Sequence, residues 1–262
     1  MSIVEKSMAT GAQTSALPGT MRTIWLIAKR AALESLRDRT TLWISIFFAV
    51  VLPVAIVMAL IRPAALDATT LKKEHAFGAL LAVYFLVVGL GPSSSSMSIA
   101  SGVFAGEKEK GNLAPLLATP ASNAAIFGGK VLGAVLPALL YAAIAEAIYL
   151  ALAIATAGAN MLQFLPLALA ISMLALVPAV AVLGATVASL FSSRVRTYSA
   201  AQMATNLAML PVMAVLFGLA FQMRDWGSPA LYIAVFIVFA IDALLLRLGS
   251  STWRREEVMA TQ

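Results

Sequence analysis

The longest charge-free stretch of the chain is AIYLALAIATAGANMLQFLPLALAISMLALVPAVAVLGATVASLFSS, residues 147–193. A helix needs roughly 20 apolar residues to cross the hydrocarbon of a membrane, so these 47 residues are long enough for two crossings and must contain a turn. Gly158 and Asn160 are turn residues and mark the break. The stretch is continuously apolar rather than alternating, which predicts membrane-spanning helices instead of strands.

The composition of the whole chain agrees with lipid as its main solvent. Of 262 residues, 61% are hydrophobic and 11% are charged, against roughly 45–50% and about 25% in soluble domains. The absence of cysteine excludes disulfides, thiolate metal sites and cysteine nucleophiles, and the one histidine, His75, excludes a multi-histidine metal cluster. The net charge of +6 lies at the ends of apolar runs, so we expect it to set topology and not to bind nucleic acid.

Apolar runs between charged residues divide the chain into predicted spans. The polar residues 1–21 are expected to form a flexible cytoplasmic tail, and 22–262 a transmembrane domain. We therefore predict an all-α integral membrane protein with six transmembrane helices, at 42–61, 77–100, 131–156, 163–190, 200–222 and 229–248.

The distribution of lysine and arginine predicts the orientation of these spans. Fourteen of these residues lie in the segments that six spans would place on one side of the membrane, together with both termini. The other side has four, namely Arg62, Lys72, Lys73 and Arg224. Because basic residues concentrate in cytoplasmic segments, we expect a multi-pass protein of the plasma (inner) membrane with both termini in the cytoplasm.

The segment before the first span, 22–39, is predicted to be an amphipathic helix. One face comprises Ile24, Trp25, Ala28, Ala31, Ala32, Ser35 and Leu36, and the other comprises Arg22, Lys29, Arg30, Glu34, Arg37 and Asp38. Two interpretations remain open. The helix lies in the membrane interface with its basic groups toward lipid phosphates, or it is a basic anchor that only fixes topology.

The loop after the second span reads FAGEKEKGNLAPLLATPAS, residues 104–122. Its alternating charges, from Glu107 to Lys110, are expected to lie in water. Three leucines then recur at helical spacing and form one apolar face, before a proline stops the helix: Leu113, Leu116, Leu117 and Pro120. Such a face needs a cover, either the membrane interface or a partner protein, although a solvated connector remains the alternative.

This loop resembles that of the ABC-2 type permeases, the membrane subunits of ABC exporters. Gly129-Lys130 at the start of the third span and Leu36-Arg37-Asp38-Arg39 before the first span are similar to the same family. The sequence departs at Asn112, where the family favours Thr or Ser, and at Ala114-Pro115, where Glu is common.

The resemblance implies a six-span permease that pairs with a second permease, a copy or a paralogue, and with separate ATPase subunits. It also implies that the segment after the second span is a short cytoplasmic coupling helix that docks on the ATPase. Carried over by motif position, the coupling residues are Glu107, Lys108, Glu109, Gly111, Leu113, Leu116, Leu117 and Pro120.

The chain itself carries no ATPase motif. Gly129-Lys130-Val131 lacks the leading glycine of a P-loop, which would fall at Ala124, and the Ser or Thr after the lysine. No His-Glu-x-x-His or Gly-x-Ser-x-Gly occurs, which weighs against an intramembrane enzyme. We therefore expect no catalytic residue, metal or cofactor in this chain, with ATP and Mg²⁺ on the partner. Export is the leading hypothesis, and an ATP-independent transporter or channel that uses Glu146 as coupling site is the alternative.

A few polar and small residues inside the predicted spans are candidates for function. Glu146, Ser94 and Ser98 form a candidate substrate path, while hydrogen bonding to neighbouring helices is the structural alternative for them and for Asp242. Gly102-x-x-x-Gly106 and Gly129-x-x-x-Gly133 allow close helix approach. The sequence does not distinguish drugs, peptides, lipids or cations as the substrate.

Because the chain has no cysteine, single introduced cysteines report topology without background. We expect Ser2→Cys, Asn112→Cys and Thr261→Cys to react with a membrane-impermeant thiol reagent only from the cytoplasm, and Asp67→Cys only from outside. Labelling of Asn112→Cys from the outside would reverse the orientation and remove the loop from the reach of an ATPase.

Overall fold

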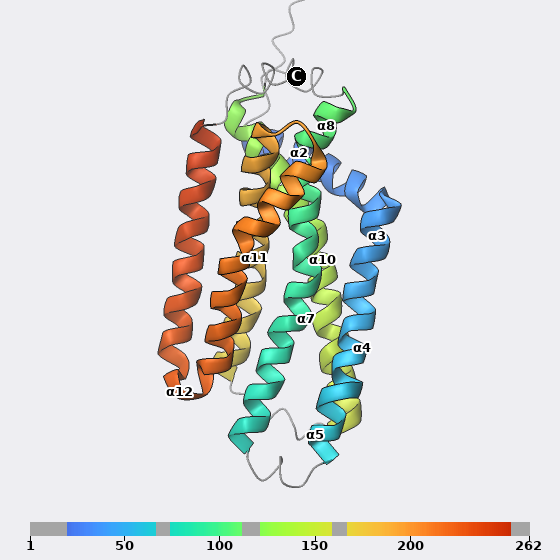
Figure 1. The fold of residues 1–262 in the computed structure, drawn as a ribbon, viewed down its shortest axis with the longest axis vertical. Helices are drawn as coiled ribbons and strands as arrows, with labels where there is room; N and C mark the ends of the chain where they lie inside the picture. Colours follow the sequence, from blue (N-terminus) through green and yellow to red (C-terminus); the bar gives the residue numbers. More distant parts are fainter. Residues whose placement is uncertain (1–19, 67–73, 112–120, 159–166, 253–262) are drawn as a thin grey trace, which may run out of the picture.

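The computed structural model describes residues 20–66, 74–111, 121–158 and 167–252. These residues form helices and no strand, which confirms the all-α prediction for this part of the chain. Figure 1 shows them as an elongated helical bundle. The helices are α2 (Thr20–Arg37), α3 (Arg39–Ile46), α4 (Leu52–Ile56), α5 (Arg62–Leu66), α7 (Glu74–Gly102), α8 (Ala105–Glu109), α10 (Asn123–Ala157), α11 (Leu167–Arg194) and α12 (Tyr198–Thr252), with π-helical turns η1 (Phe47–Val51) and η2 (Val57–Ile61).

Five of the helical segments are long and apolar enough to cross a membrane, which supports the prediction of a membrane protein. They are Arg39–Leu66, Leu80–Gly102, Asn123–Ala157, Ala170–Arg194 and Tyr198–Leu216. Each corresponds to one of the first five predicted spans. The third helix starts earlier than its predicted start at residue 131, because the Ser122 hydroxyl accepts a hydrogen bond from the Ala125 N–H and caps α10 there.

The long helix α12 reverses direction within the bundle. A straight helix of its 55 residues would be about 80 Å long. Instead, both of its ends lie near the same end of α7 and α10. The Tyr198 hydroxyl is 2.7 Å from Ser98 Oγ, and a Cβ on Gly249 would lie 2.6 Å from the Phe127 ring. Figure 1 accordingly shows α12 running to the lower end of the bundle and returning, so it has two antiparallel arms.

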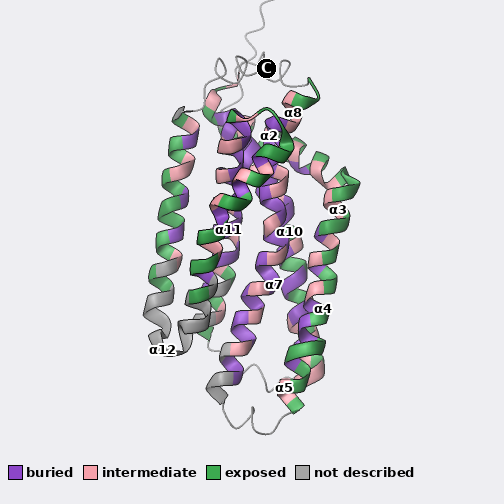
Figure 2. Ribbon diagram, in the orientation of Figure 1, coloured by how far each residue is buried: buried purple, intermediate pink, exposed green. Residues whose placement is uncertain are grey.

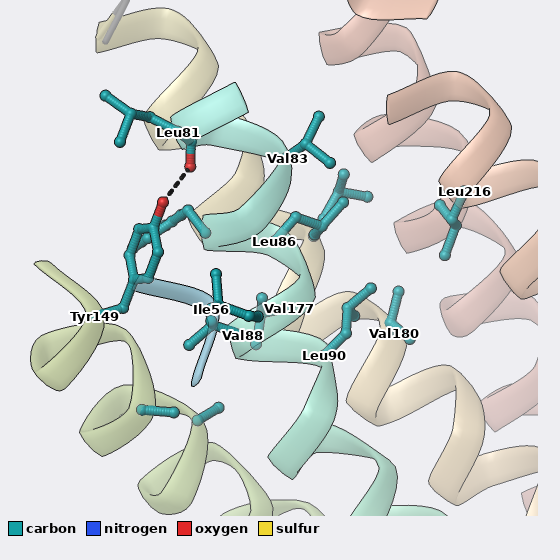
Figure 3. Packing of buried hydrophobic residues seen from close by; sticks show 14 of the residues in the cluster. Ile56, Leu81, Val83, Leu86, Val88, Leu90, Tyr149, Val177, Val180 and Leu216 are labelled. Carbon is teal, nitrogen blue, oxygen red and sulfur yellow. Dashed lines mark hydrogen bonds between the residues drawn. The ribbon is translucent and has the colours of Figure 1, made fainter. Parts of the chain in front are cut away.

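Burial is concentrated on α7, α10 and α11, while the 39–66 segment and α12 expose much of their surface (Figure 2). In Figure 3, Tyr149 of α10 points toward α7, where its hydroxyl donates to the Leu81 carbonyl at 3.0 Å. Lipid tails are as apolar as these side chains, so burial alone gives little drive for helix association in a membrane. Close packing and buried hydrogen bonds must therefore supply much of the stability.

The N-terminal helix α2 packs directly on α10 at the predicted Gly129-x-x-x-Gly133 motif. A Cβ on Gly129 would lie 2.8 Å from Ile27 Cβ, and a Cβ on Gly133 would lie 2.6 Å from Ala31 Cβ. Only glycine lets the two backbones approach this closely. The Gly102-x-x-x-Gly106 motif does not act this way, because a Cβ on Gly106 would meet nothing within 4 Å.

The two faces of α2 differ in one respect from the sequence prediction. Ala28 and Ala32 are buried as expected, but Trp25 is 53% exposed and lies with Leu26 and Leu33 beside Arg22 and Lys29. The residues of α2 that meet the glycines include Ile27, Ala28 and Ala31, and Trp25 lies off that face on the outer surface. The placement of this outer face in the membrane interface stays a prediction.

A carboxylate cap separates α2 from the first span. Asp38 Oδ2 accepts hydrogen bonds from the Thr41 N–H at 2.9 Å and from the Thr41 hydroxyl at 2.6 Å. These bonds favour the ionised form and lower the pKa of Asp38. The capped helix continues to Leu66 through η1 and η2, which flank Pro53, a residue with no N–H to donate to a regular helix.

A bulky residue at position 133 should separate α2 from α10. We expect Gly133→Leu to lower the thermal unfolding midpoint in detergent, because overpacking typically costs about 1–3 kcal/mol. Gly128→Leu is the matched control, since a Cβ at Gly128 would meet nothing within 4 Å on the same helix. Equal midpoints for the two variants would show that the close approach of α2 contributes nothing to stability.

Candidate functional site

The predicted coupling segment begins with α8, which follows α7 at the end of the bundle where α2 lies (Figure 1). Phe104 leads into α8, and its ring stacks on that of Phe127 with centroids 6.3 Å apart. Gly111, with φ of +68°, follows α8 in a left-handed conformation that favours glycine. The short helix thus presents Glu107, Lys108 and Glu109 next to the ends of the long helices.

Glu107 forms a largely buried ion pair with Lys130 of α10. The Lys130 ammonium is 2.5 Å from Glu107 Oε2, and the side chains are 5% and 32% exposed respectively. The ammonium also donates to the Val103 carbonyl and lies 4.7 Å from the centre of the Phe104 ring. A buried charge is tolerated only when it is paired in this way, so the contacts fix α8 and the end of α7 onto α10.

Lys108 caps the end of α11. Its ammonium donates to the carbonyls of Ser193 at 2.8 Å and Val195 at 3.2 Å. The last carbonyls of a helix lack partners within the helix and carry partial negative charge, so a lysine here satisfies them. Burial, and to a smaller extent the charge of Arg196, lower the pKa of Lys108.

Glu109 contacts the start of α12. Its Oε1 accepts a hydrogen bond from the Tyr198 N–H at 3.1 Å. The first N–H groups of a helix lack partners within the helix and carry partial positive charge, which favours a carboxylate at this position. Lys108 and Glu109 therefore hold the two sides of the short connection between α11 and α12.

Ser192 ties the junction between α7 and α8 to α11. Its hydroxyl oxygen accepts hydrogen bonds from the N–H groups of Phe104 at 3.1 Å and Ala105 at 2.9 Å, and it donates to the Ser101 carbonyl at 2.7 Å. The sequence did not identify Ser192, because a serine near the end of an apolar run cannot be distinguished by pattern from serines at other helix ends.

Three consecutive charged residues thus bind three different long helices. We call this arrangement the α8 clamp and define it as Glu107, Lys108, Glu109, Lys130 and Ser192. The prediction that Glu107 to Lys110 lie in water is met by Glu109 and Lys110, which are exposed, but only in part by Glu107 and Lys108, which are partly exposed. An opposite charge compensates Glu107 and a helix terminus compensates Lys108, in addition to water. A displacement of α8 would therefore act on α10, α11 and α12 together.

The remaining predicted coupling residues follow the clamp in the chain. Gly111 is the last described residue before the gap in the structure. Leu113, Leu116, Leu117 and Pro120 lie outside the described residues, so the predicted apolar face stays a prediction.

The predicted substrate path does not come together as one site. Glu146 is 6% exposed and lies against Gly89 of α7 and near Val177 of α11. The hydroxyl of Ser94 donates to the Gly91 carbonyl at 2.6 Å, and that of Ser98 is bound to Tyr198. Ser98 is nine residues beyond Gly89, about 14 Å along the helix, and is part of the contact with α12.

Two carboxyls inside the bundle have buried oxygens with no hydrogen-bond partner among the described residues. Glu146 Oε1 has no partner among the described residues, and neither has Oδ1 or Oδ2 of Asp242, a residue that is 4% exposed. In the described part of the chain, no group of three or more His, Asp or Glu side chains is arranged to hold a metal ion.

Mutation of the two residues of the ion pair is expected to destabilise the protein to different extents. Glu107→Leu leaves the buried ammonium of Lys130 without its counter-charge, which costs about 3–5 kcal/mol of stability when nothing else compensates the charge. Lys130→Met leaves Glu107, which is 32% exposed on its side chain and so reaches water more readily. We expect Glu107→Leu to lower the thermal unfolding midpoint more than Lys130→Met, and the double variant to recover part of the loss. The reverse order would show that the pair is not the main contact of Lys130.

No protein-family model matches the chain, and no curated protein matches it as a relative. The function is therefore proposed from the geometry of the α8 clamp and the residues around it.

Proposed function

We propose that this chain is the membrane subunit of an ATP-binding cassette exporter, related to the ABC-2 type permeases and driven by a separate ATPase subunit. The observation that carries this proposal is the α8 clamp. The ATPase docks on the loop between the second and third spans, and the clamp passes its motion to the bundle. ATP and Mg²⁺ bind to the partner and not to this chain.

The contacts of the clamp favour a force-transmitting role over that of a passive connector. A connector needs only enough length to join α7 to α10. Here Glu107 pairs with Lys130 on α10, and the two following residues bind the facing ends of α11 and α12. The segment that resembles a coupling helix follows directly after these residues, so a load on its leucines would reach three helices through short, charged contacts.

The reversal of α12 supports a six-span topology. Its second arm contains the predicted span 229–248 and returns to the end of the bundle where α12 begins, because Tyr198 and Gly249 both lie there. Five segments are already long and apolar enough to cross, and we propose this arm as the sixth crossing. An even number of crossings places both termini on the same side of the membrane, and the distribution of basic residues favours the cytoplasm of a plasma (inner) membrane protein as that side.

The exporter is proposed to contain two permeases and two ATPases. Six spans are few for a translocation path, so a second copy or a paralogue completes it. The outer faces of the 39–66 segment and of α12 expose many large apolar side chains, among them Trp43, Phe47, Leu207, Leu210 and Phe236. These faces are covered by lipid or by the second permease.

An ATP-independent transporter remains the second candidate, and one observation favours it. Glu146 is a buried carboxyl with an unpartnered oxygen at membrane depth, as expected for a group that couples transport to an ion. Copurification of a P-loop ATPase from native membranes would favour the exporter, whereas transport by the purified chain alone would favour the second candidate.

The loop leucines provide the direct test of docking. Leu116→Ser with Leu117→Ser removes apolar contacts worth roughly 1.5–3 kcal/mol per fully buried side chain, so the affinity for the ATPase should fall tenfold or more. Charge reversal by Glu107→Lys with Glu109→Lys breaks the clamp contacts with Lys130 and Tyr198, so it should lower the coupling of ATP hydrolysis as well as weaken docking, the latter more so at low salt. Binding is measured by pull-down, and coupling by substrate-stimulated ATP hydrolysis.

The matched control replaces two leucines at the opposite end of the bundle. Leu66 and Leu167 are each 75% exposed, so Leu66→Ser with Leu167→Ser changes surface hydrophobicity without touching the loop. Unchanged ATPase binding and unchanged ATP hydrolysis in the loop variant would reduce the loop to a connector and remove the main support for the exporter.

A further inference from the structure

The carboxyl of Glu146 occupies a fitted niche between α7, α10 and α11. A Cβ on Gly89 would collide with Glu146 Oε1 and would lie 2.5 Å from Val177 Cγ2. The backbone of the niche is held in place, because the Ser93 hydroxyl donates to the Gly89 carbonyl at 2.8 Å. Glycine at position 89 is therefore what gives the carboxyl room beside α7, and we call this arrangement the Gly89 niche.

No opposite charge faces this carboxyl from the helices that enclose it. Between Leu80 and Gly102 of α7, and between Leu167 and Ser193 of α11, the sequence has no charged residue. On α10, Lys130 is 16 residues away, about 24 Å along the helix, and is paired with Glu107.

Among the described residues, the other elements packed on α10 also place no opposite charge at Glu146. Helix α2 packs at Gly129 and Gly133, 13 residues or more from Glu146, and Arg39 and Arg62 lie toward the two ends of the 39–66 segment. The second arm of α12 contributes another buried acid, Asp242, and carries Arg247 near its end. Tyr149, three residues further along α10, donates its hydroxyl to the Leu81 carbonyl and not to Glu146.

An ionised carboxylate in such a place is largely shielded from water and, among the described residues, has neither a hydrogen-bond donor for Oε1 nor an adjacent counter-charge, which is costly at membrane depth. We infer that the Gly89 niche is a proton-binding site, in which Glu146 is protonated while α7, α10 and α11 are packed together and releases its proton to water when α7 and α10 separate. On the side of α7 the niche is filled, since it has no room even for a methyl group on Gly89.

This site links bundle opening to proton release. The packed state holds one more proton at Glu146 than the open state, so alkaline pH favours opening and acid pH favours the packed state. The inference goes beyond the proposed function, because it concerns a proton and holds whether or not an ATPase drives the bundle.

Infrared spectroscopy of the full-length protein in lipid bilayers tests the protonation state directly, through the C=O stretch of a protonated carboxyl. We expect this band at neutral pH in the wild type, its loss in Glu146→Gln, and its persistence in Asp242→Asn, which removes the other buried carboxyl. A wild-type spectrum equal to that of Glu146→Gln at neutral pH would overturn the inference.

A disulfide tests the link to packing. Ser93 and Ala142 each lie one turn from the niche residues on α7 and α10, toward the same end of the bundle, and the chain has no native cysteine. In Ser93→Cys with Ala142→Cys, the Glu146 band should persist to a more alkaline pH when the disulfide is formed than after reduction. Loss of the band at the same pH in both forms would show that protonation is independent of opening.

Gly89→Ala offers a third readout that does not alter the carboxyl itself. The added methyl should expel the carboxyl from the niche, so the band should disappear at a lower pH than in the wild type. Gly128→Ala is the control, because a Cβ there meets nothing within 4 Å. An unchanged titration in Gly89→Ala would refute the niche. None of these measurements needs an ATPase or a transported substrate, so their failure is distinguishable from failure of the exporter proposal.

Discussion

The architecture at the α8 end of the bundle depends on one constraint: the ammonium of Lys130 is buried within the bundle and must be compensated. The compensation comes from Glu107, the Val103 carbonyl and the Phe104 ring, all of which precede or belong to α8. Pairing with Lys130 therefore brings α8 back against α10. Once α8 is there, Lys108 and Glu109 reach the end of α11 and the start of α12, and the three helices share one short charged connector.

Further from α8, the helices are held together by close backbone contacts and not by charged side chains. In lipid, burying a leucine brings little gain over leaving it among acyl chains, so small residues at helix contacts become decisive. Gly129 and Gly133 bring α2 onto α10 immediately beside Lys130, and Gly89 brings α7 onto Glu146. Glycines at helix contacts thus have two roles here. Gly129 and Gly133 allow α2 to pack on α10, and Gly89 leaves space for the carboxyl of Glu146.

The proposed function and the proton site concern different parts of one bundle. The clamp joins α8 to α10, α11 and α12, while the Gly89 niche lies where α7, α10 and α11 meet. Helix α10 takes part in both, with Lys130 near its start and Glu146 deeper in the bundle. A displacement that begins at α8 would therefore have a direct path to the contact between α7 and α10 on which protonation of Glu146 depends.

The sequence alone determined the helical class and the apolar runs that become helices, because a charge in hydrocarbon is so costly that its position marks the boundaries of a span. It also identified Gly129-x-x-x-Gly133 and the charged loop, but not their partners. Only the tertiary structure decided that Ala31 and Ile27 fill the glycine surface, that Ser192 binds the end of α7, and that Gly89 faces Glu146. The reason is physical: Ser192 and the backbone it binds are 87 residues or more apart along the chain. Periodicity describes only the face of one helix, whereas such contacts depend on how separate helices pack against each other.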